Sequence, residues 1–521
     1  MNSKTWTRTI ALTLLAALAI PFQLAAQGKV EPHHPHQYHH YQPIDMGTFG
    51  GPNSSFILPP PQLRLLNSSG TAVGGADTPA SDPASCWNFD CYLSYGFKWQ
   101  DGAAHKLSAL PGFNSSFTYG VSDSGLVAGG SENGIDPLTG LPALEAILWG
   151  KDGDLTDLGT LGGYESSANA VNNRGQVAGE AMNTILDPYT SNFWDFLLTG
   201  ATQVHAVRWT KSRGMQDLGT LGGTDSAAFL INDRGQVAGW SFTNSTPNPV
   251  PDDCSLFQQN LPTVDPFLWD AGKMIDLGTL GGTCGHANSL NNRGQVAGAS
   301  DLAGDQSCHP FLWDKTRGMK DLGTLGGDSG QAFYINDAGE VVGRANLPGV
   351  LGCDQFNTPA HAFLWKNGVM TDLGTPAGDL CSVADGINSK HQIVGNGWDC
   401  VNELPPAGHA FLSEDGEPVV DLNTLIPPNS GLQLTVAAYV NDAGEIAALG
   451  TLPNGDIHAF VLRPCDENHP DVEGCDYSLV DAATADAQST ARSYVPSTTQ
   501  GTPRSRWSNR YQIPGLQSPS R

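Results

Sequence analysis

Residues Asp217–Gly239 read DLGTLGGTDSAAFLINDRGQVAG, and the first and last phrases of this stretch recur along the chain. The first phrase begins intact at Asp157, Asp217, Asp276 and Asp321, with weaker copies at Asp45, Lys106, Asp372 and Asp421. The last phrase has clear copies from Val171, Ile231, Leu290 and Ile335, with looser ones from Leu66, Val121, Ile387 and Val440. A third phrase, HAFLW and its relatives, begins at Tyr95, Glu145, His205, Asp265, His309, His361, His409 and His458. Each phrase therefore occurs eight times in a fixed order, which indicates a repeat protein.

One repeat contains the signals for four short strands. In INDRGQVAG the Asn-x-x-Gly segment suits a tight hairpin, because Asn bonds the local backbone and Gly accepts a positive φ without steric cost. The runs around it, SAAFLI and QVAGWS, are strand-length and β-prone. HAFLW supplies a third strand, and segments such as GKMIDLGTL supply a fourth. Successive copies of the first phrase start 45 to 61 residues apart, so the repeat matches a four-stranded propeller blade.

A tryptophan closes the third strand in six of the repeats. These residues are Trp99, Trp149, Trp209, Trp269, Trp313 and Trp365. One large apolar side chain per repeat is what packing between successive blades requires, so we expect a structural role for this position.

The two ends of the repeat region are offset by one strand. The chain enters with a fourth-strand phrase, IDMGTFGG from Ile44, and leaves after a third-strand phrase, HAFVLRP, which ends at Pro464. The N-terminal strand can therefore complete the last blade, which would leave no open sheet edge. The sequence predicts an all-β fold, an eight-bladed β-propeller; an open β-solenoid with capped ends is the alternative.

The three phrases together resemble the HAF repeat family of probable extracellular bacterial proteins. The resemblance covers about four fifths of the chain, with Ser413 and Leu462 in place of the expected tryptophans. It implies a secreted β-rich repeat protein, and it carries over no reaction, ligand or catalytic residue.

Composition agrees with an exported, non-helical protein. The chain has 521 residues, 62 Gly and only 15 % charged residues, a composition that argues against helical bundles and coiled coils. Its net charge of −26 repels phosphate backbones and anionic lipids, so no nucleic-acid partner is expected. Such a surface attracts cations such as Ca²⁺, although no cofactor is predicted.

The N-terminal segment has the features of a secretory signal. In residues 1–26, Lys4 and Arg8 precede an apolar run, and small residues end at Ala26. We expect a secreted, extracellular or periplasmic protein with no membrane span in the mature chain. Residues 27–43 are predicted to be a His- and Pro-rich linker, 44–464 the repeat region, and 465–521 a largely disordered C-terminal segment.

Ten cysteines in an exported chain make disulfides plausible. Equivalent positions of Cys284 and Cys381 favour the pairs Cys284–Cys308 and Cys381–Cys400. The pairs Cys86–Cys91 and Cys465–Cys475 are local candidates. Cys254 and Cys353 remain, and pairing of Cys254 with Cys284 and of Cys308 with Cys353 is an alternative.

The recurring histidines raise the question of a metal site. The residues are His205, His309, His361, His409 and His458, yet Tyr95, Glu145 and Asp265 stand at the same position in other repeats. We interpret the position, and the Asp of DLGTLGG, as structural hydrogen-bonding sites, with the His tying neighbouring loops or blades. A weaker candidate for binding metal is the segment after the signal, which holds His33, His34, His36, His39 and His40.

Function is predicted only at a coarse level. Long segments rich in Pro, Asp and aromatics separate the second and third strands of several repeats, and they should share a face with the inter-blade connections. We expect a monomeric, non-enzymatic binding or scaffold module whose ligand on this loop-rich face is an extracellular carbohydrate or protein. The aromatic candidates there are Tyr189, Phe193, Trp194 and Phe196. The alternative is a propeller hydrolase or lyase that acts on a polysaccharide, for which spacing identifies no catalytic residue.

Overall fold

The computed structural model describes residues 36–56, 63–81, 92–138, 142–188, 202–248, 261–348, 360–376, 378–398, 408–470 and 472–481. The chain divides into a unit Met1–His36 and a unit Gln37–Arg521, and every strand lies in the second. The predicted signal segment lies outside the described residues. Within the described ranges, no helix is long and apolar enough to cross a membrane.

The first half of the chain forms sheets of four consecutive strands. One holds β3 (Ser54–Ser55), β4 (Ala72–Ser81), β5 (Tyr92–Gln100) and β6 (Ala103–Lys106). The next holds β7 (Ser116–Val121), β8 (Val127–Ile135), β9 (Pro142–Trp149) and β10 (Leu155–Asp157). A third holds β11 (Ser166–Val171), β12 (Val177–Leu186), β13 (Thr202–Thr210) and β14 (Gly214–Asp217).

An eight-stranded sheet follows. Its strands are β15 (Ser226–Ile231), β16 (Val237–Phe242), β17 (Val264–Asp270), β18 (Lys273–Asp276), β19 (Gly281–Leu290), β20 (Val296–Leu302), β21 (Cys308–Asp314) and β22 (Gly318–Asp321). One parallel residue pair, Val264 with Cys284, joins its two antiparallel halves. Each half has the strand order of a four-stranded sheet.

The last three four-stranded sheets continue the pattern. The first holds β23 (Gly330–Ile335), β24 (Val341–Asn346), β25 (Ala360–Lys366) and β26 (Val369–Gly374). The second holds β27 (Cys381–Ile387), β28 (Gln392–Trp398), β29 (His409–Glu414) and β30 (Val420–Asp421), followed by a 3-10 turn, η1 (Leu422–Thr424). The third holds β31 (Gln433–Val440), β32 (Ile446–Thr451), β33 (Ile457–Pro464) and β2 (Tyr41–Asp45).

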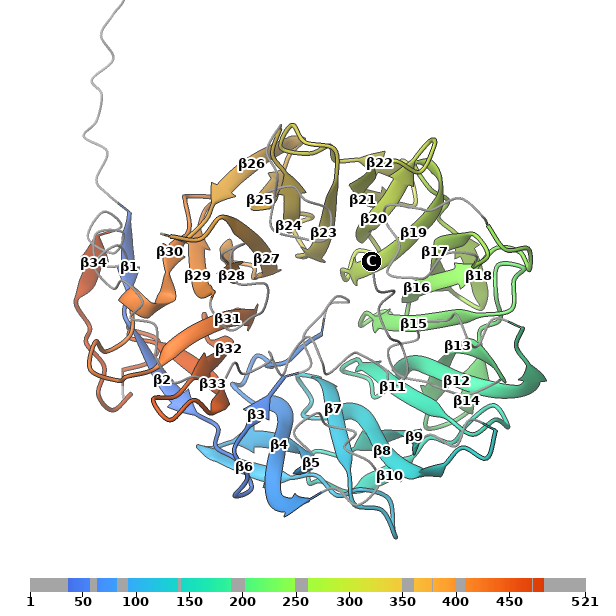
Figure 1. Ribbon diagram of the computed structural model, residues 1–521, viewed down its shortest axis with the longest axis horizontal. Coiled ribbons are helices and arrows are strands. Elements are labelled where there is room, and N and C mark those ends of the chain that lie inside the picture. The colour runs from blue at the N-terminus through green and yellow to red at the C-terminus, as the bar shows by residue number, and fades with distance from the viewer. Residues whose placement is uncertain are drawn as a thin grey trace, which may run out of the picture. The chain divides into compact units, whose positions relative to one another are not determined.

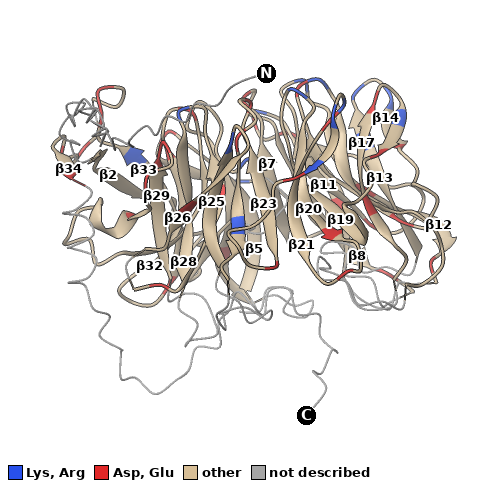
Figure 2. Cartoon of the chain, turned by 90° about the horizontal axis from the view of Figure 1, so that it is seen from above, with Lys and Arg blue, Asp and Glu red and all other residues tan. Residues whose placement is uncertain are grey.

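The arrangement confirms the predicted unit of four antiparallel strands. In Figure 1 the sheets follow one another in chain order around a common centre, and the first strand of each lies nearest that centre. Figure 2, the view along the sheets, shows the strands running between two faces. We call the face formed by the turns between first and second strands the hairpin face, and the opposite one the loop face.

The loop face carries the DLGTLGG segments between sheets. Gly163 N–H donates to the Met182 carbonyl and Gly223 N–H to the Phe242 carbonyl, both at 3.0 Å. These segments therefore lie beside the ends of the second strands, from which the long connections leave. Most residues of those connections lie outside the described ranges.

Glycine in the phrase VAG allows the first and second strands to approach closely. The first strand of each four-stranded repeat from β7 to β31 carries a bulge at an equivalent place, for example between Ala228 and Leu230, and β19 and β31 carry a second register shift. A Cβ built on Gly239, opposite this bulge, would overlap the Ala227 carbonyl oxygen. Glycine at this position is thus required by the close backbone contact.

The N-terminal strand joins the last sheet, and this corrects the predicted linker 27–43. Strand β2 pairs with β33 from Tyr41–Pro464 to Asp45–Phe460. Before it, β1 (Gln37–His39) pairs with β34 (Leu479–Asp481), so ordered structure also continues beyond Pro464. Tyr38 and Tyr41 are buried in an apolar cluster, and this explains why the predicted linker contains strands.

Candidate functional site

The asparagine of the hairpin phrase makes two kinds of hydrogen bond. Asn232 Oδ1 accepts from the backbone N–H groups of Arg234 and Gln236, both at 3.0 Å, which confirms the predicted local bonding. Asn232 Nδ2 donates at 3.0 Å to the carbonyl of Asn291, which lies in the other half of the eight-stranded sheet. One side chain therefore fixes its own hairpin and links it to a neighbour.

The same inter-sheet bond is found at seven positions, at 2.9 to 3.2 Å. Each donor is the hairpin asparagine and each acceptor is the matching carbonyl of another four-stranded sheet or half-sheet: Asn67 to Ser122, Asn172 to Asn232, Asn232 to Asn291, Asn291 to Asn336, Asn336 to Asn388, Asn388 to Asn441, and Asn441 to Asn67. Ser122 stands where asparagine would donate, and its hydroxyl bonds locally with Ser124. The last of these links joins the β31–β33 sheet to the first sheet.

A second set of polar residues lies one position further along each hairpin. We call it the mouth ring; it consists of Ser68, Asp123, Asn173, Asp233, Asn292, Asp337, Ser389 and Asp442. Backbone N–H groups of this ring donate to the side chain of the next member, as from Asn173 to Asp233 at 2.9 Å and from Asp233 to Asn292 at 3.0 Å. Sequence reasoning missed the ring, although Asn or Asp follows the hairpin asparagine in most copies of the phrase.

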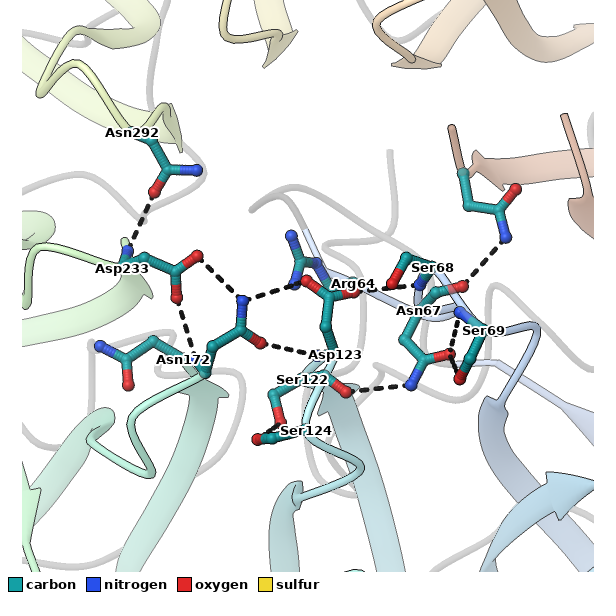
Figure 3. Close-up of polar contacts among 12 residues, drawn as sticks. Arg64, Asn67, Ser68, Ser69, Ser122, Asp123, Ser124, Asn172, Asp233 and Asn292 are labelled. Carbon is teal, nitrogen blue, oxygen red and sulfur yellow. Dashed lines mark hydrogen bonds and ion pairs between the residues drawn. The ribbon is translucent and has the colours of Figure 1, made fainter. Parts of the chain in front are cut away.

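Arg64 adds the one cation among the residues that line this mouth (Figure 3). Its Nη1 lies 2.9 Å from Asp123 Oδ2, and its carbonyl accepts from Val121 N–H. Burial opposes ionisation of Asp123, but the Ser68 N–H and the Arg64 charge outweigh it and hold the pKa of Asp123 below its ordinary value. No repeat phrase contains Arg64, so the sequence offered no signal for it.

The mouth ring surrounds a cavity of about 230 Å³ at the hairpin face. Its deeper wall is apolar and includes Leu230, Leu290 and Ile335, while its rim is polar. Tyr334 and Tyr439 also line it and meet edge to face, with ring centroids 6.0 Å apart. The cavity therefore offers hydrogen-bonding groups above an apolar and aromatic floor.

The recurring histidines bond to the recurring aspartates. The Nδ1–carboxylate distances are 2.9 Å for His205–Asp217, 3.0 Å for His309–Asp321, 2.9 Å for His361–Asp372 and 2.8 Å for His458–Asp45. Each pair joins the third and fourth strands of one sheet. His205 also hydrogen-bonds to the backbone of Thr224, and His458 to that of Pro52, each in a connection that leads to another sheet. At these two positions the expected tie to a neighbouring loop is therefore present beside the bond within the sheet. His409 differs, since it contacts Asp379 at 3.1 Å.

Two of these pairs, His205–Asp217 and His458–Asp45, favour the charged forms of both partners. Burial would lower the pKa of His205, but Asp217 outweighs burial and raises it. The pKa of Asp217 is lowered in turn by His205 and Gly219 N–H, against burial. The same directions hold for His458 and Asp45.

Repeats without histidine carry other pairs at these positions. Glu145 faces Asp157, and burial together with the Asp157 charge raises the pKa of Glu145 to about 7. Burial and Asp276 likewise raise the pKa of Asp265 to about 7. In the first sheet Lys106 Nζ lies 3.1 Å from the centre of the Tyr95 ring.

A further pair of carboxyl groups lies at the loop face. Asp225 is 1 % exposed, and burial followed by the charge of Asp187 raises its pKa to about 7. Val204 N–H donates to Asp225 Oδ1 at 2.8 Å. Asp187 lies next to the end of the described part of its connection, and the aromatic candidates Tyr189, Phe193, Trp194 and Phe196 lie outside the described residues.

The six tryptophans pack at the ends of the third strands. Trp99, Trp149, Trp313 and Trp365 are buried, and Trp209 and Trp269 pack against apolar clusters. Three of the tryptophan rings lie under a cation from another sheet. The distance to the ring centre is 5.1 Å from Arg208 Cζ to Trp269, 4.5 Å from Lys320 Nζ to Trp365, and 5.7 Å from Arg463 Cζ to Trp99. The last of these again joins the β31–β33 sheet to the first one.

The cysteines follow the predictions in part. The Cys465–Cys475 disulfide is present, with the Cα atoms 5.5 Å apart. Cys308 is disulfide-bonded, but β20 lies between the strands of Cys284 and Cys308. Two strand spacings of about 4.8 Å exceed the reach of a disulfide, which contradicts the Cys284–Cys308 pair. Cys381 is buried in β27; Cys86, Cys91, Cys254, Cys353 and Cys400 lie outside the described residues.

The N-terminal histidines are divided between described and undescribed residues. His33 and His34 lie outside the described ranges. His40 Nδ1 lies 3.3 Å from the Leu425 carbonyl, and its Nε2 lies 3.7 Å from Asp476. Within the part of the chain that is described, no three His, Cys, Asp or Glu side chains are grouped so as to hold a metal ion.

Comparison with known proteins yields remote structural similarities, of which two are described below. No family model and no curated protein matches the chain. TolB from Acinetobacter baumannii is similar at 10 % identity and a TM-score of 0.30, over 75 % of this chain and 81 % of that one. A provisionally assigned gluconolactonase is similar at 10 % identity and a TM-score of 0.25, over 61 % and 82 % of the two chains. Similarities this low carry no argument about fold or activity.

Proposed function

We propose that the chain is an exported eight-bladed β-propeller of the HAF repeat type. Each half of the eight-stranded sheet then counts as one blade. Three contacts across one seam support a closed ring: the pairing of β2 with β33, the Asn441–Asn67 hydrogen bond, and Arg463 over Trp99. An open solenoid would leave these surfaces without partners. The Cys465–Cys475 disulfide agrees with an oxidising compartment outside the cytoplasm.

The propeller acts as an extracellular binding or scaffold module. The observation that carries this proposal is the hydrogen bond from the hairpin asparagine to the neighbouring repeat, which is found at seven hairpins. It joins successive four-stranded repeats into one rigid body. Rigid bodies of this kind position variable loops for recognition. Strands β8 and β12 extend to Ile135 and Leu186, which are 54 % and 68 % exposed and lie where the long connections begin. The ligand is an extracellular carbohydrate or protein bound at the loop face.

A polysaccharide hydrolase or lyase is the second candidate, and one observation favours it. Asp187 and Asp225 form a carboxyl pair at the base of a long loop, and the pKa of Asp225 is raised to about 7. A carboxyl group that remains protonated near neutral pH beside a second carboxylate is suited to general acid catalysis.

One experiment separates the two candidates. The full-length mature protein is mixed with insoluble and soluble polysaccharides, with and without EDTA, and co-sedimentation and released reducing ends are scored together. Retention without products supports the binding module. Product release that is lost in Asp225→Asn but kept in Asp152→Asn, an exposed carboxylate outside the pair, supports the enzyme.

A further inference from the structure

Only one part of the mouth ring, from Asp123 to Asn292, has all its backbone N–H groups hydrogen-bonded to side chains of the ring. Between Asp123 and Asn292 each backbone N–H has a side-chain acceptor, and Asn173 Nδ2 bridges Asp123 and Asp233 at 3.0 Å each. These groups serve the structure and have little capacity for a ligand.

The other side of the ring keeps unused groups. Asp442 Oδ1 accepts from Ser389 N–H at 2.9 Å, whereas its Oδ2 accepts no hydrogen bond from the described residues. In the rest of the ring, an Asn or Asp side chain accepts from the backbone N–H of the member before it. Ser389 follows Asp337 and Ser68 follows Asp442, and the serine side chains are shorter than Asn or Asp. Asp337 is already engaged, since its Oδ1 accepts from Asn292 N–H at 2.7 Å and its Oδ2 from Asn292 Nδ2 at 3.1 Å. Within the described part of the mouth, the carboxylate oxygen left without a donor is therefore Asp442 Oδ2, with Ser389 and Ser68 also in the lining.

The cavity below these groups has the size of a six-membered ring. Its volume of about 230 Å³ exceeds the ~150 Å³ of an engineered protein cavity that admits benzene. Its lining is apolar at Leu290 and Ile335, and it also includes the buried Tyr334 and Tyr439. A ligand that fits has apolar faces and hydroxyl groups at its edge.

Charge narrows the class of ligand. The charged residues of the lining are Asp123, Asp233, Asp337, Asp442 and Arg64, and Arg64 is paired with Asp123. Among the described lining residues, Asp233, Asp337 and Asp442 have no compensating cation, so an anionic ligand is repelled.

We propose that this mouth is a second binding site, separate from the loop face, for one neutral or amino-substituted sugar ring, such as the end of a glycan chain. A hydroxyl or ammonium group of the sugar donates to Asp442 Oδ2, and the apolar faces of the sugar lie against the aliphatic wall. The site discriminates against sugars that carry a carboxylate.

Calorimetric titration of the full-length mature protein tests the proposal. The probes are methyl glycosides of glucose, galactose and glucosamine, with glucuronate as the acidic counterpart. We expect saturable binding of at least one neutral or amino sugar and at least tenfold weaker binding of glucuronate. Absence of saturable binding to all four, or binding of glucuronate as tight as that of the others, overturns the proposal.

Asp442→Asn is the diagnostic variant, because its Oδ1 can still accept from Ser389 N–H while the free acceptor oxygen becomes a donor. We expect at least a tenfold loss of sugar affinity with an unchanged melting temperature. Asp152→Asn, which removes the same charge from an exposed turn, is expected to bind within twofold of the parent. Equal affinities in the two variants would contradict the site. Polysaccharide retention at the loop face is unaffected by Asp442→Asn, so the two proposals fail independently.

Discussion

At the scale of single residues, the hairpin asparagine combines hydrogen bonds within its own turn with a hydrogen bond to a neighbouring repeat. Asn232 bonds two local N–H groups, Gln236 and a carbonyl 59 residues away. Its amide therefore stabilises a turn and a sheet-to-sheet contact together, which explains its presence in seven of the eight copies.

Asn232→Ala should lower the free energy of unfolding by about 2–4 kcal/mol, because buried donors and acceptors in two sheets lose their partner. Urea denaturation measures the change. Lys211→Ala, at an exposed residue of a nearby turn, is the control and should stay within about 0.5 kcal/mol of the parent. A loss equal to that of the control would show that the inter-sheet bond contributes nothing.

Glu145 makes stability depend on pH. Its pKa is raised from the ordinary 4.5 to about 7 in the folded state, so folding is favoured when the group is protonated. This stabilisation is fully present below pH 4.5 and is lost as pH rises to about 7. Glu145→Gln keeps a donor toward Asp157, so the variant should gain stability over the parent as pH rises from 5 to 8. Parallel urea midpoints of the two proteins across this range would contradict the assignment.

At the scale of elements, the four-stranded sheets and the hairpins followed from the sequence, because Asn, Gly and alternating apolar residues act locally. The Asn441–Asn67 bond, the mouth ring and Arg64 could not be predicted, since they depend on contacts between repeats far apart in the chain. The His–Asp pairs lie between these cases. Both residues recur, but only the strand register, with Val207 opposite Asp217, shows that they meet within one sheet.

The glycine opposite the bulge is an element-scale requirement. Gly239→Ala places a methyl group against the Ala227 carbonyl, so the first and second strands must separate. We expect a loss of several kcal/mol, on the scale of a core overpacking. Gly75→Ala is the matched control, because a Cβ there meets no atom within 4 Å. Thermal unfolding of both variants measures the difference, and equal melting temperatures would show that the bulge adapts freely.

At the scale of the whole molecule, the seam between the last and first sheets distinguishes a closed propeller from an open solenoid. Ile457 N–H donates to Asn53 Oδ1 at 3.2 Å and Ala459 N–H to Ser54 Oγ at 3.1 Å, in addition to the Asn441–Asn67 bond. These contacts join residues about 400 positions apart in the chain, and they support the closed ring that we propose.

A circular permutant tests this closure directly. Gln37 and Asp481 are opposite each other in the antiparallel β1–β34 pair, so a two-residue Asn-Gly hairpin can join them. New termini are opened within residues 249–260, in one of the long connections. In a closed ring every sheet keeps both neighbours, so the permutant should unfold cooperatively within a few degrees of the parent. In an open solenoid the new link would have to span the distance between two terminal sheets, and the permutant would fail to fold. Circular dichroism and thermal melting compare the permutant with the parent. The control is the same cut without the Asn-Gly link, which gives two separate chains.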